Sequence, residues 1–222
     1  MKIAALYDIH GNLPALEAVL DEVQREGVDG IVAGGDVVPG PMPRETIDML
    51  AHSPVPVRFI HGNGDREVLA LMSGLHTGWY RSAPERWKAP VGSILFCHAT
   101  PHNDTDCFTR VTSEDQLLRL LGQIDTRLVV CGHTHMQFDR SVNGIRVVNA
   151  GSVGMPFGGS GAYWLLLGPR VHLRRTPYDL ALAALRIRET PYPDAGAFAA
   201  RNVLNPPSEE EMHDVFSRAE SS

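Results

Sequence analysis

The sequence lacks long apolar runs, and none of its hydrophobic segments approaches the length that crosses a membrane. The N-terminus enters a predicted strand at once, without the basic and then apolar pattern of a secretory signal. Cysteine is scarce, with three residues. Cys97 and Cys131 lie inside apolar runs, where reduced core thiols are expected, and Cys107 lies in a polar loop with no assigned role. These absences predict a reduced, cytoplasmic protein with no membrane partner.

A basic stripe is missing as well. The formal net charge is −6 at pH 7, and no cluster of lysine and arginine offsets it. Nucleic acid is therefore disfavoured as a partner, because binding to it depends on clustered positive charge. A small phosphoester is compatible with an acidic surface. The 222 residues, 43% hydrophobic and 21% charged, are ordinary for one globular domain, and they indicate no particular oligomeric state.

What the sequence does contain is a series of short apolar segments that each end in a residue able to bind a metal ion. Such segments, bounded by glycine and polar residues, predict buried strands that deliver a polar side chain at their ends. The segments with the residues that follow them are 2–7 before Asp8 and His10, 30–35 before Asp36, 57–61 before Asn63, 93–97 before His98, and 127–131 before His133 and His135.

These donors are too numerous for one ion. A carboxylate shared by two cations explains why oxygen and imidazole donors gather in such number, and we interpret Asp36 as that bridge. Taken alone, Asp36 also fits a turn aspartate. His61 is predicted to be a strand-end residue rather than a ligand.

Helix and turn signals complete the predicted secondary structure. A helix is expected from about Pro14, with Gly27 just past its end, and Asn12 before it fits an N-cap and a substrate contact equally well. An irregular excursion is expected at 74–90, a linker at 191–207, and a peripheral acidic helix after Ser208. Further helices are predicted at 44–51, from Arg66 to about 72, at 113–121 and at 178–188, and hairpins at 136–149 and 162–175.

Five motifs occur together in a fixed order: Asp8-Ile9-His10-Gly11-Asn12, Gly35-Asp36, Gly62-Asn63, His98 and Gly132-His133-Thr134-His135. In this order they resemble the calcineurin-like metallophosphoesterases, and the start of the chain resembles their small bacterial and archaeal phosphodiesterase branch. The resemblance covers residues 1–176. It implies an α/β (α+β) fold, a four-layer αββα sandwich in which two packed mixed β-sheets are flanked by helices. Residues 177–222 are expected to add helices and a linker that pack on the same domain.

The resemblance also implies a dinuclear metal site in the strand-end loops. One divalent ion is implied for Asp8, His10, Asp36 and His135, and the other for Asp36, Asn63, His98 and His133. Mixed oxygen and nitrogen donors suit Mn, Fe, Zn or Ni. A hydroxide bridging the two ions would attack phosphorus next to Asp36, Asn63 and His98, which are the implied catalytic residues. The candidate substrate contacts are Asn12, Gly64, Arg66 and His102.

The chain departs from the family pattern at Gly64, where many members carry a histidine that assists the phosphoryl group or protonates the leaving group. His102 in a neighbouring loop is a candidate replacement for that acid. The departure puts monoester hydrolysis in doubt, so we expect a phosphodiesterase acting on small or nucleotide-like diesters.

The alternatives are a phosphomonoesterase or nuclease of the same fold, and a non-catalytic scaffold that binds proteins. The complete ligand set argues against a scaffold, because crowded carboxylates without metal repel one another and are costly to desolvate.

Overall fold

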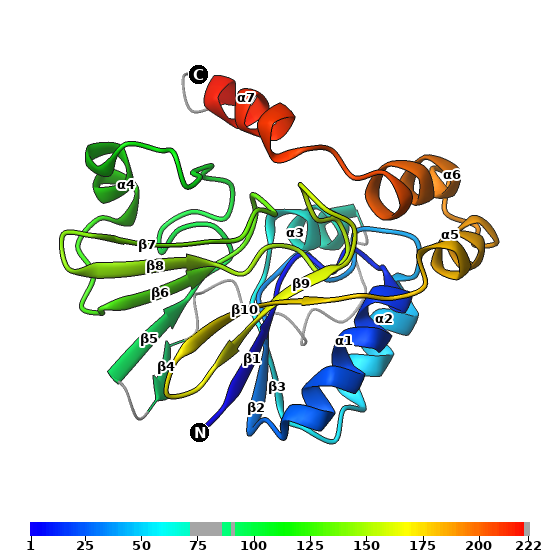
Figure 1. Cartoon of the computed structure of the whole chain (residues 1–222), viewed down its shortest axis with the longest axis horizontal. Helices are drawn as coiled ribbons and strands as arrows, with labels where there is room; N and C mark the ends of the chain where they lie inside the picture. The colour runs from blue at the N-terminus through cyan, green and yellow to red at the C-terminus, as the bar shows by residue number, and fades with distance from the viewer. Residues whose placement is uncertain (72–85, 90–91, 220–222) are drawn as a thin grey trace.

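A computed structural model describes residues 1–71, 86–89 and 92–219, and its strands form two five-stranded mixed sheets (Figure 1). The first sheet has the order β10-β9-β1-β2-β3, and its strands are β1 (Ile3–Leu6), β2 (Gly30–Ala33), β3 (Val57–Phe59), β9 (Ala162–Leu167) and β10 (Val171–Thr176). The second has the order β4-β5-β6-β8-β7, and its strands are β4 (Arg86–Ala89), β5 (Gly92–Phe96), β6 (Leu128–Cys131), β7 (Phe138–Val142) and β8 (Ile145–Asn149).

In each sheet the three parallel strands are adjacent. These are β1, β2 and β3 in one sheet and β5, β6 and β8 in the other. The remaining strands pair antiparallel to them or to one another, including the two predicted hairpins β7–β8 and β9–β10. Asn143 and Gly144 turn the first hairpin with φ of 47° and 80°, values that asparagine and glycine tolerate well.

Alternation along β1 explains why the sheets pack face to face. Ile3 and Ala5, with Tyr7 just beyond the strand, point into a core shared with residues of the second sheet such as Phe96 and Val130. The intervening Ala4 and Leu6 point the other way, toward Leu16, Val19 and Val23 of α1 (Leu13–Glu26). A strand buried on both faces is therefore apolar at every position.

Helices cover the two outer faces. On the first sheet these are α1 and α2 (Pro43–Ala51), whereas Leu117 and Leu121 of α4 (Glu114–Leu121) pack against Val129 and Cys131 of the second. The order of layers is helix, sheet, sheet, helix, and the predicted four-layer αββα sandwich is confirmed. The other helices are α3 (Asn63–Leu71), α5 (Leu180–Arg188), α6 (Ala195–Phe198), the π-helix η1 (Ala199–Leu204) and α7 (Glu209–Ala219).

Three predictions of secondary structure are wrong. Part of the predicted irregular excursion, residues 86–89, forms β4, because antiparallel pairing with β5 adds this four-residue segment to the edge of the second sheet. Residues 74–85 and 90 lie outside the described residues. The predicted linker contains α6 and η1, whose Phe198 and Val203 pack against α5. Helix α3 begins at Asn63, three residues before the expected Arg66.

None of the helices described at 1–71 and 92–219 combines the length and the apolar character needed to cross a bilayer.

Asn12 acts as the N-cap of α1. Its side-chain oxygen accepts a hydrogen bond from Ala15 N (3.3 Å), and its amide donates to Gly154 O (2.9 Å) and to the Tyr178 hydroxyl (3.4 Å). The side chain is fully buried, so the structure favours the N-cap over the substrate contact.

We expect Asn12→Ala to lower the free energy of unfolding by about 1–3 kcal/mol, since it removes a cap and leaves a buried carbonyl unpaired. Chemical denaturation measures this loss. Ser113→Ala, at the exposed N-cap of α4, is the matched control and should cost about 1 kcal/mol. If Asn12→Ala unfolds at the wild-type midpoint, the structural role is wrong.

Candidate metal centre

Loops that follow β1, β2, β3, β5 and β6 bring the seven predicted ligands together at one end of the sheets. Backbone hydrogen bonds join the first two of these loops, from Asp8 N to Gly35 O (3.0 Å) and from His10 N to Asp36 O (2.8 Å). The convergence expected from the sequence follows from parallel strands that end at one edge.

Five of the predicted ligands have a left-handed backbone, with φ between 49° and 66°: Asp8, His10, Asp36, His133 and His135. Within the described residues the only other non-glycine residue with positive φ is Asn143, in the hairpin turn. Such a conformation costs about 1–3 kcal/mol per residue and persists only when the surrounding structure enforces it. The loops therefore hold these side chains in place at the expense of local stability.

The first group of donors comprises Asp8, His10 and His135. Asp8 Oδ1 lies 3.2 Å from His135 Nε2 and 3.9 Å from His10 Nε2, and the two imidazole nitrogens are 3.3 Å apart. Two donors each about 2.1 Å from one cation are separated by roughly 3–4 Å, so these distances fit a single ion. Asp8 Oδ1 is buried and has no hydrogen-bond partner among the described residues, as expected for an atom that binds a cation.

Asp36 lies between this group and a second one. Its Oδ2 is 3.7 Å from His10 Nε2 and 3.8 Å from His98 Nε2, while its Oδ1 accepts a hydrogen bond from Gly64 N (2.8 Å). Asp8 also approaches the second group, with Oδ1 3.9 Å from His98 Nε2. Asp8, Asp36 and His98 thus form a second cluster of possible ligands, and both carboxylates lie between the two clusters.

Asn63 extends the second group toward His133. With its NH2 group facing the rings, the amide donates to His98 Nε2 (3.2 Å) and His133 Nδ1 (3.1 Å), and its oxygen accepts from Gly64 N (3.2 Å). The reversed amide points its oxygen at the same two nitrogens. A cation requires this second orientation, because all three atoms then act as ligands.

The buried histidines differ in the direction of their pKa shifts. Burial by itself would raise the pKa of Asp8, but the adjacent His135, His98 and His10 lower it well below its usual range. Burial alone would lower the pKa of His135, yet its contact with Asp8 raises it above 6.5. Burial, followed by the neighbouring His98, lowers the pKa of His133 to about 4.

Asp65 supports the centre and was missed as a functional residue. Its buried carboxylate accepts hydrogen bonds from Val37 N (2.9 Å), Val38 N (3.0 Å) and Gly62 N (3.1 Å), and so ties the loop after β2 to the loop after β3. Burial and the nearby Asp36 raise its pKa to about 6. The Asn-Gly-Asp run directly after a predicted strand was the available signal, since an aspartate there can bond backbone N–H groups.

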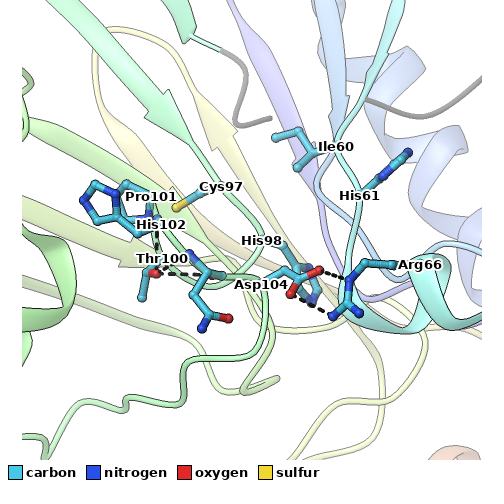
Figure 2. Close-up of a pocket in the computed structure, with 10 residues that line it drawn as sticks. Ile60, His61, Arg66, Cys97, His98, Thr100, Pro101, His102 and Asp104 are labelled. Carbon is cyan, nitrogen blue, oxygen red and sulfur yellow. Dashed lines mark hydrogen bonds and ion pairs between the residues drawn. The ribbon is translucent and has the colours of Figure 1, made fainter. Parts of the chain in front are cut away.

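A cavity of about 310 Å³ opens beside His98 (Figure 2). Arg66 lines it and is held by Asp104 through two hydrogen bonds, Nε to Oδ2 (2.8 Å) and Nη2 to Oδ1 (3.0 Å). This places Arg66 close to the metal centre, as a substrate contact would be.

His102 lines the same cavity, but its ring points away from His98 and Arg66 in Figure 2. Its Nε2 lies 3.2 Å from the carbonyl of Leu121, at the end of α4. The geometry therefore gives no support to His102 as the acid. Gly64 has no side chain that could contact a substrate, and its backbone N–H donates a hydrogen bond to Asp36 Oδ1.

The acidic C-terminal helix lies at the surface, as the sequence predicts, and it also contacts a loop beside the candidate metal centre (Figure 1). Phe157 stacks on His135 (ring centroids 4.9 Å apart, interplanar angle 25°), and Phe216 of α7 lies against Phe157 (6.2 Å). Glu209, at the start of the same helix, forms an ion pair with Arg110 (2.5 Å). Helix α7 therefore contacts the loop that packs against His135, one of the predicted metal ligands.

The four-layer fold and this cluster of carboxylates and imidazoles define a metal-binding αββα protein. Residues 1–168 match the calcineurin-like phosphoesterase superfamily domain, and the chain therefore belongs to that superfamily, as its motifs indicate. Members of the superfamily use divalent metal ions, in agreement with the two candidate clusters of ligands.

Several known proteins are similar to the chain. Phosphodiesterase YfcE of Escherichia coli is 30% identical over 184 residues, which cover 75% of this chain and 87% of YfcE. The solved structure of Yfce, a phosphoesterase, has a TM-score of 0.58 at 26% identity, over 76% of this chain and 89% of that chain.

Two further solved structures have the same fold, and their sequence identities support no closer relationship than that. A metallophosphoesterase from Sphaerobacter thermophilus has a TM-score of 0.66 at 24% identity, over 91% of this chain and 100% of that chain. Vps29 from Entamoeba histolytica, complexed with zinc, has a TM-score of 0.54 at 18% identity, over 81% and 100%.

We expect Asp36→Asn to lose metal from both clusters and to lower turnover by more than about a hundredfold, because each cation loses an anionic donor. The amide oxygen can still accept from Gly64 N, so the loop should stay folded. Elemental analysis of the purified protein measures the metal. Asp48→Asn, an exposed carboxylate on α2, is the matched control. Wild-type metal content and turnover in Asp36→Asn would contradict the bridging role.

Lowering the pH should weaken the binding of metal ions by the two clusters to different extents. A proton competes with a cation for His135 already above pH 6.5, because the pKa of this group is raised, whereas His133 stays neutral down to about pH 4. Metal titrations at decreasing pH should therefore show that the binding phase that depends on His135 weakens before protonation of His133 contributes to any loss. Equal weakening of both phases would refute this difference.

Proposed function

We propose that the protein is a two-metal phosphodiesterase that hydrolyses small or nucleotide-like phosphodiesters. The observation that carries this proposal is the position of two carboxylates between the clusters. Asp36 Oδ2 lies 3.7 Å from His10 Nε2 and 3.8 Å from His98 Nε2, and Asp8 Oδ1 lies 3.9 Å from each of the same nitrogens. Such a carboxylate can bind two cations at once and hold them at the short separation that two-metal phosphoester hydrolysis uses.

Two sets of residues would hold the cations, one of Asp8, His10, Asp36 and His135 and the other of Asp36, Asn63, His98 and His133. Their mixed oxygen and nitrogen donors suit Mn, Fe, Zn or Ni. When bound, the two cations supply Lewis acidity to the phosphoryl oxygens and lower the pKa of a water molecule. The chain itself positions the ligands through its left-handed loops and through Asp65.

The site around Gly64 favours diesters. A Cβ atom at this position would lie 2.7 Å from Pro39 Cγ and 3.1 Å from Asp36 Oδ1, so the Pro39 ring occupies the space that a histidine there needs. Without that imidazole, a poor leaving group lacks a general acid. A diester with a stable leaving group needs such an acid least.

The charge of the neighbouring cavity also favours diesters over monoesters. Asp104 neutralises Arg66 through their two hydrogen bonds, so the cavity adds little net positive charge beside His98. A monoester carries two negative charges and a diester carries one, and a neutral pocket discriminates against the greater charge. We assign the cavity to an ester group of the substrate, with Arg66 at its rim.

The proposal extends to the rest of the chain. Residues 177–222 belong to the same domain as the 1–176 core, because Arg186 of α5 pairs with Glu17 of α1 and α7 contacts Phe157.

The protein acts in the cytoplasm on a small substrate. A scaffold without catalysis is disfavoured, since it has no need of five strained ligand positions around buried carboxylates.

The wild-type enzyme should hydrolyse bis(p-nitrophenyl) phosphate at least about tenfold faster than p-nitrophenyl phosphate, because no imidazole is present at Gly64. Steady-state assays with added Mn²⁺ measure both rates. Equal rates on the two substrates would contradict the proposed specificity.

A histidine at position 64 should raise monoester turnover only when Pro39 makes room. We expect Gly64→His alone to lose metal, since its Cβ would collide with Pro39, and the double variant Pro39→Ala/Gly64→His to gain monoester activity. Pro39→Ala is the matched control. If the double variant binds two metals without such a gain, the missing imidazole does not set specificity.

A further inference from the structure

The four imidazoles of the metal centre differ in the partner of their second ring nitrogen. Three of them face a backbone carbonyl through Nδ1: His10 with Pro39 O (3.1 Å), His98 with Gly34 O (3.0 Å) and His135 with Met155 O (2.7 Å). The fourth, His133, faces a thiol instead, with Nε2 3.6 Å from Cys107 Sγ. Such outer partners fix the tautomer and orientation of a metal-binding imidazole.

We propose that Cys107 is a positioning residue, which holds His133 in the tautomer and orientation that bind a metal ion. This inference rests on the proposed two-metal function. It gives a role to the one cysteine that lies outside the core, since Cys97 and Cys131 are buried in the second sheet.

The direction of each hydrogen bond supports this role. Nδ1 of His133 faces the Asn63 amide at 3.1 Å, so Nδ1 is the atom available to a cation and Nε2 carries the hydrogen. The Cys107 thiol donates to Thr105 O (3.7 Å), which leaves a sulfur lone pair for the hydrogen on Nε2. Sulfur can therefore donate in one direction and accept in the other.

The loop around Cys107 is anchored beside His133. Thr134, the next residue after His133, donates from its hydroxyl to Phe108 O (3.2 Å), and the Phe108 side chain is buried against Phe138. The backbone of His133 is fixed separately, since its N–H donates to Asp8 Oδ2 (2.9 Å). Removing the thiol should thus free the ring without moving the backbone.

The test compares wild type, Cys107→Ala and Cys107→Ser in metal titrations followed by elemental analysis after dialysis. Cys107→Ala should weaken the binding of one metal ion by about 10- to 100-fold and leave the other unchanged, because outer partners have effects of this size. Cys107→Ser, whose hydroxyl both donates and accepts, should recover most of the affinity. Thermal melting of the metal-free proteins should be alike, which separates positioning from a loss of folding.

The outcomes distinguish this inference from the proposed function. If wild type and Cys107→Ala bind two ions equally tightly, the positioning role is wrong and the two-metal site stands. If wild type binds one ion and Cys107→Ala loses it, the two-metal proposal is wrong and the positioning role stands. A thiolate-to-cobalt absorption band in the Co²⁺-loaded wild type that disappears in Cys107→Ser would make Cys107 a ligand and overturn the inference.

Discussion

The structure depends on the burial of two carboxylates, Asp8 and Asp36, among four imidazoles. Asp8 is fully buried and Asp36 is 5% exposed, and charged groups at such depth are costly unless they are paired or bind metal. Nearby histidines compensate part of this cost, as the lowered pKa of Asp8 and the raised pKa of His135 indicate. Divalent cations would compensate the rest. Cation binding would then account both for the buried charge of the site and for the arrangement of the loops around it.

That arrangement explains why so much of the chain serves five short loops. The central strands β1, β2 and β6 are almost entirely buried, and the parallel strands end at one edge, which fixes where each loop begins. The loops then adopt left-handed conformations that neither sheet requires. Hydrogen bonds from outside the ligand set hold them there, through the Asp65 carboxylate and through Ser152, whose hydroxyl donates to Asp8 O (2.7 Å).

Periodicity and strand-end chemistry predict the parts that are local. The ligand-bearing strand ends, α1 with its caps, and both hairpins follow from short apolar runs, turn residues and donor side chains. The parts that depend on distant contacts were missed. Strand β4 is a four-residue edge strand that pairs with β5, and the thiol of Cys107 meets His133 across 26 residues of sequence. His102 looked like a spare acid because the sequence does not reveal that its ring meets Leu121 O.

The central claim is that two cations share Asp36. Crystals grown with Mn²⁺ and measured by anomalous diffraction test it most directly, because each manganese ion gives its own peak. The account predicts two peaks about 3.5–4 Å apart, with one Asp36 oxygen between them, His10 and His135 at one peak, and His98 and His133 at the other. A single peak bound by Asp8, His10 and His135, with Asp36 contacting nothing but protein, would contradict it.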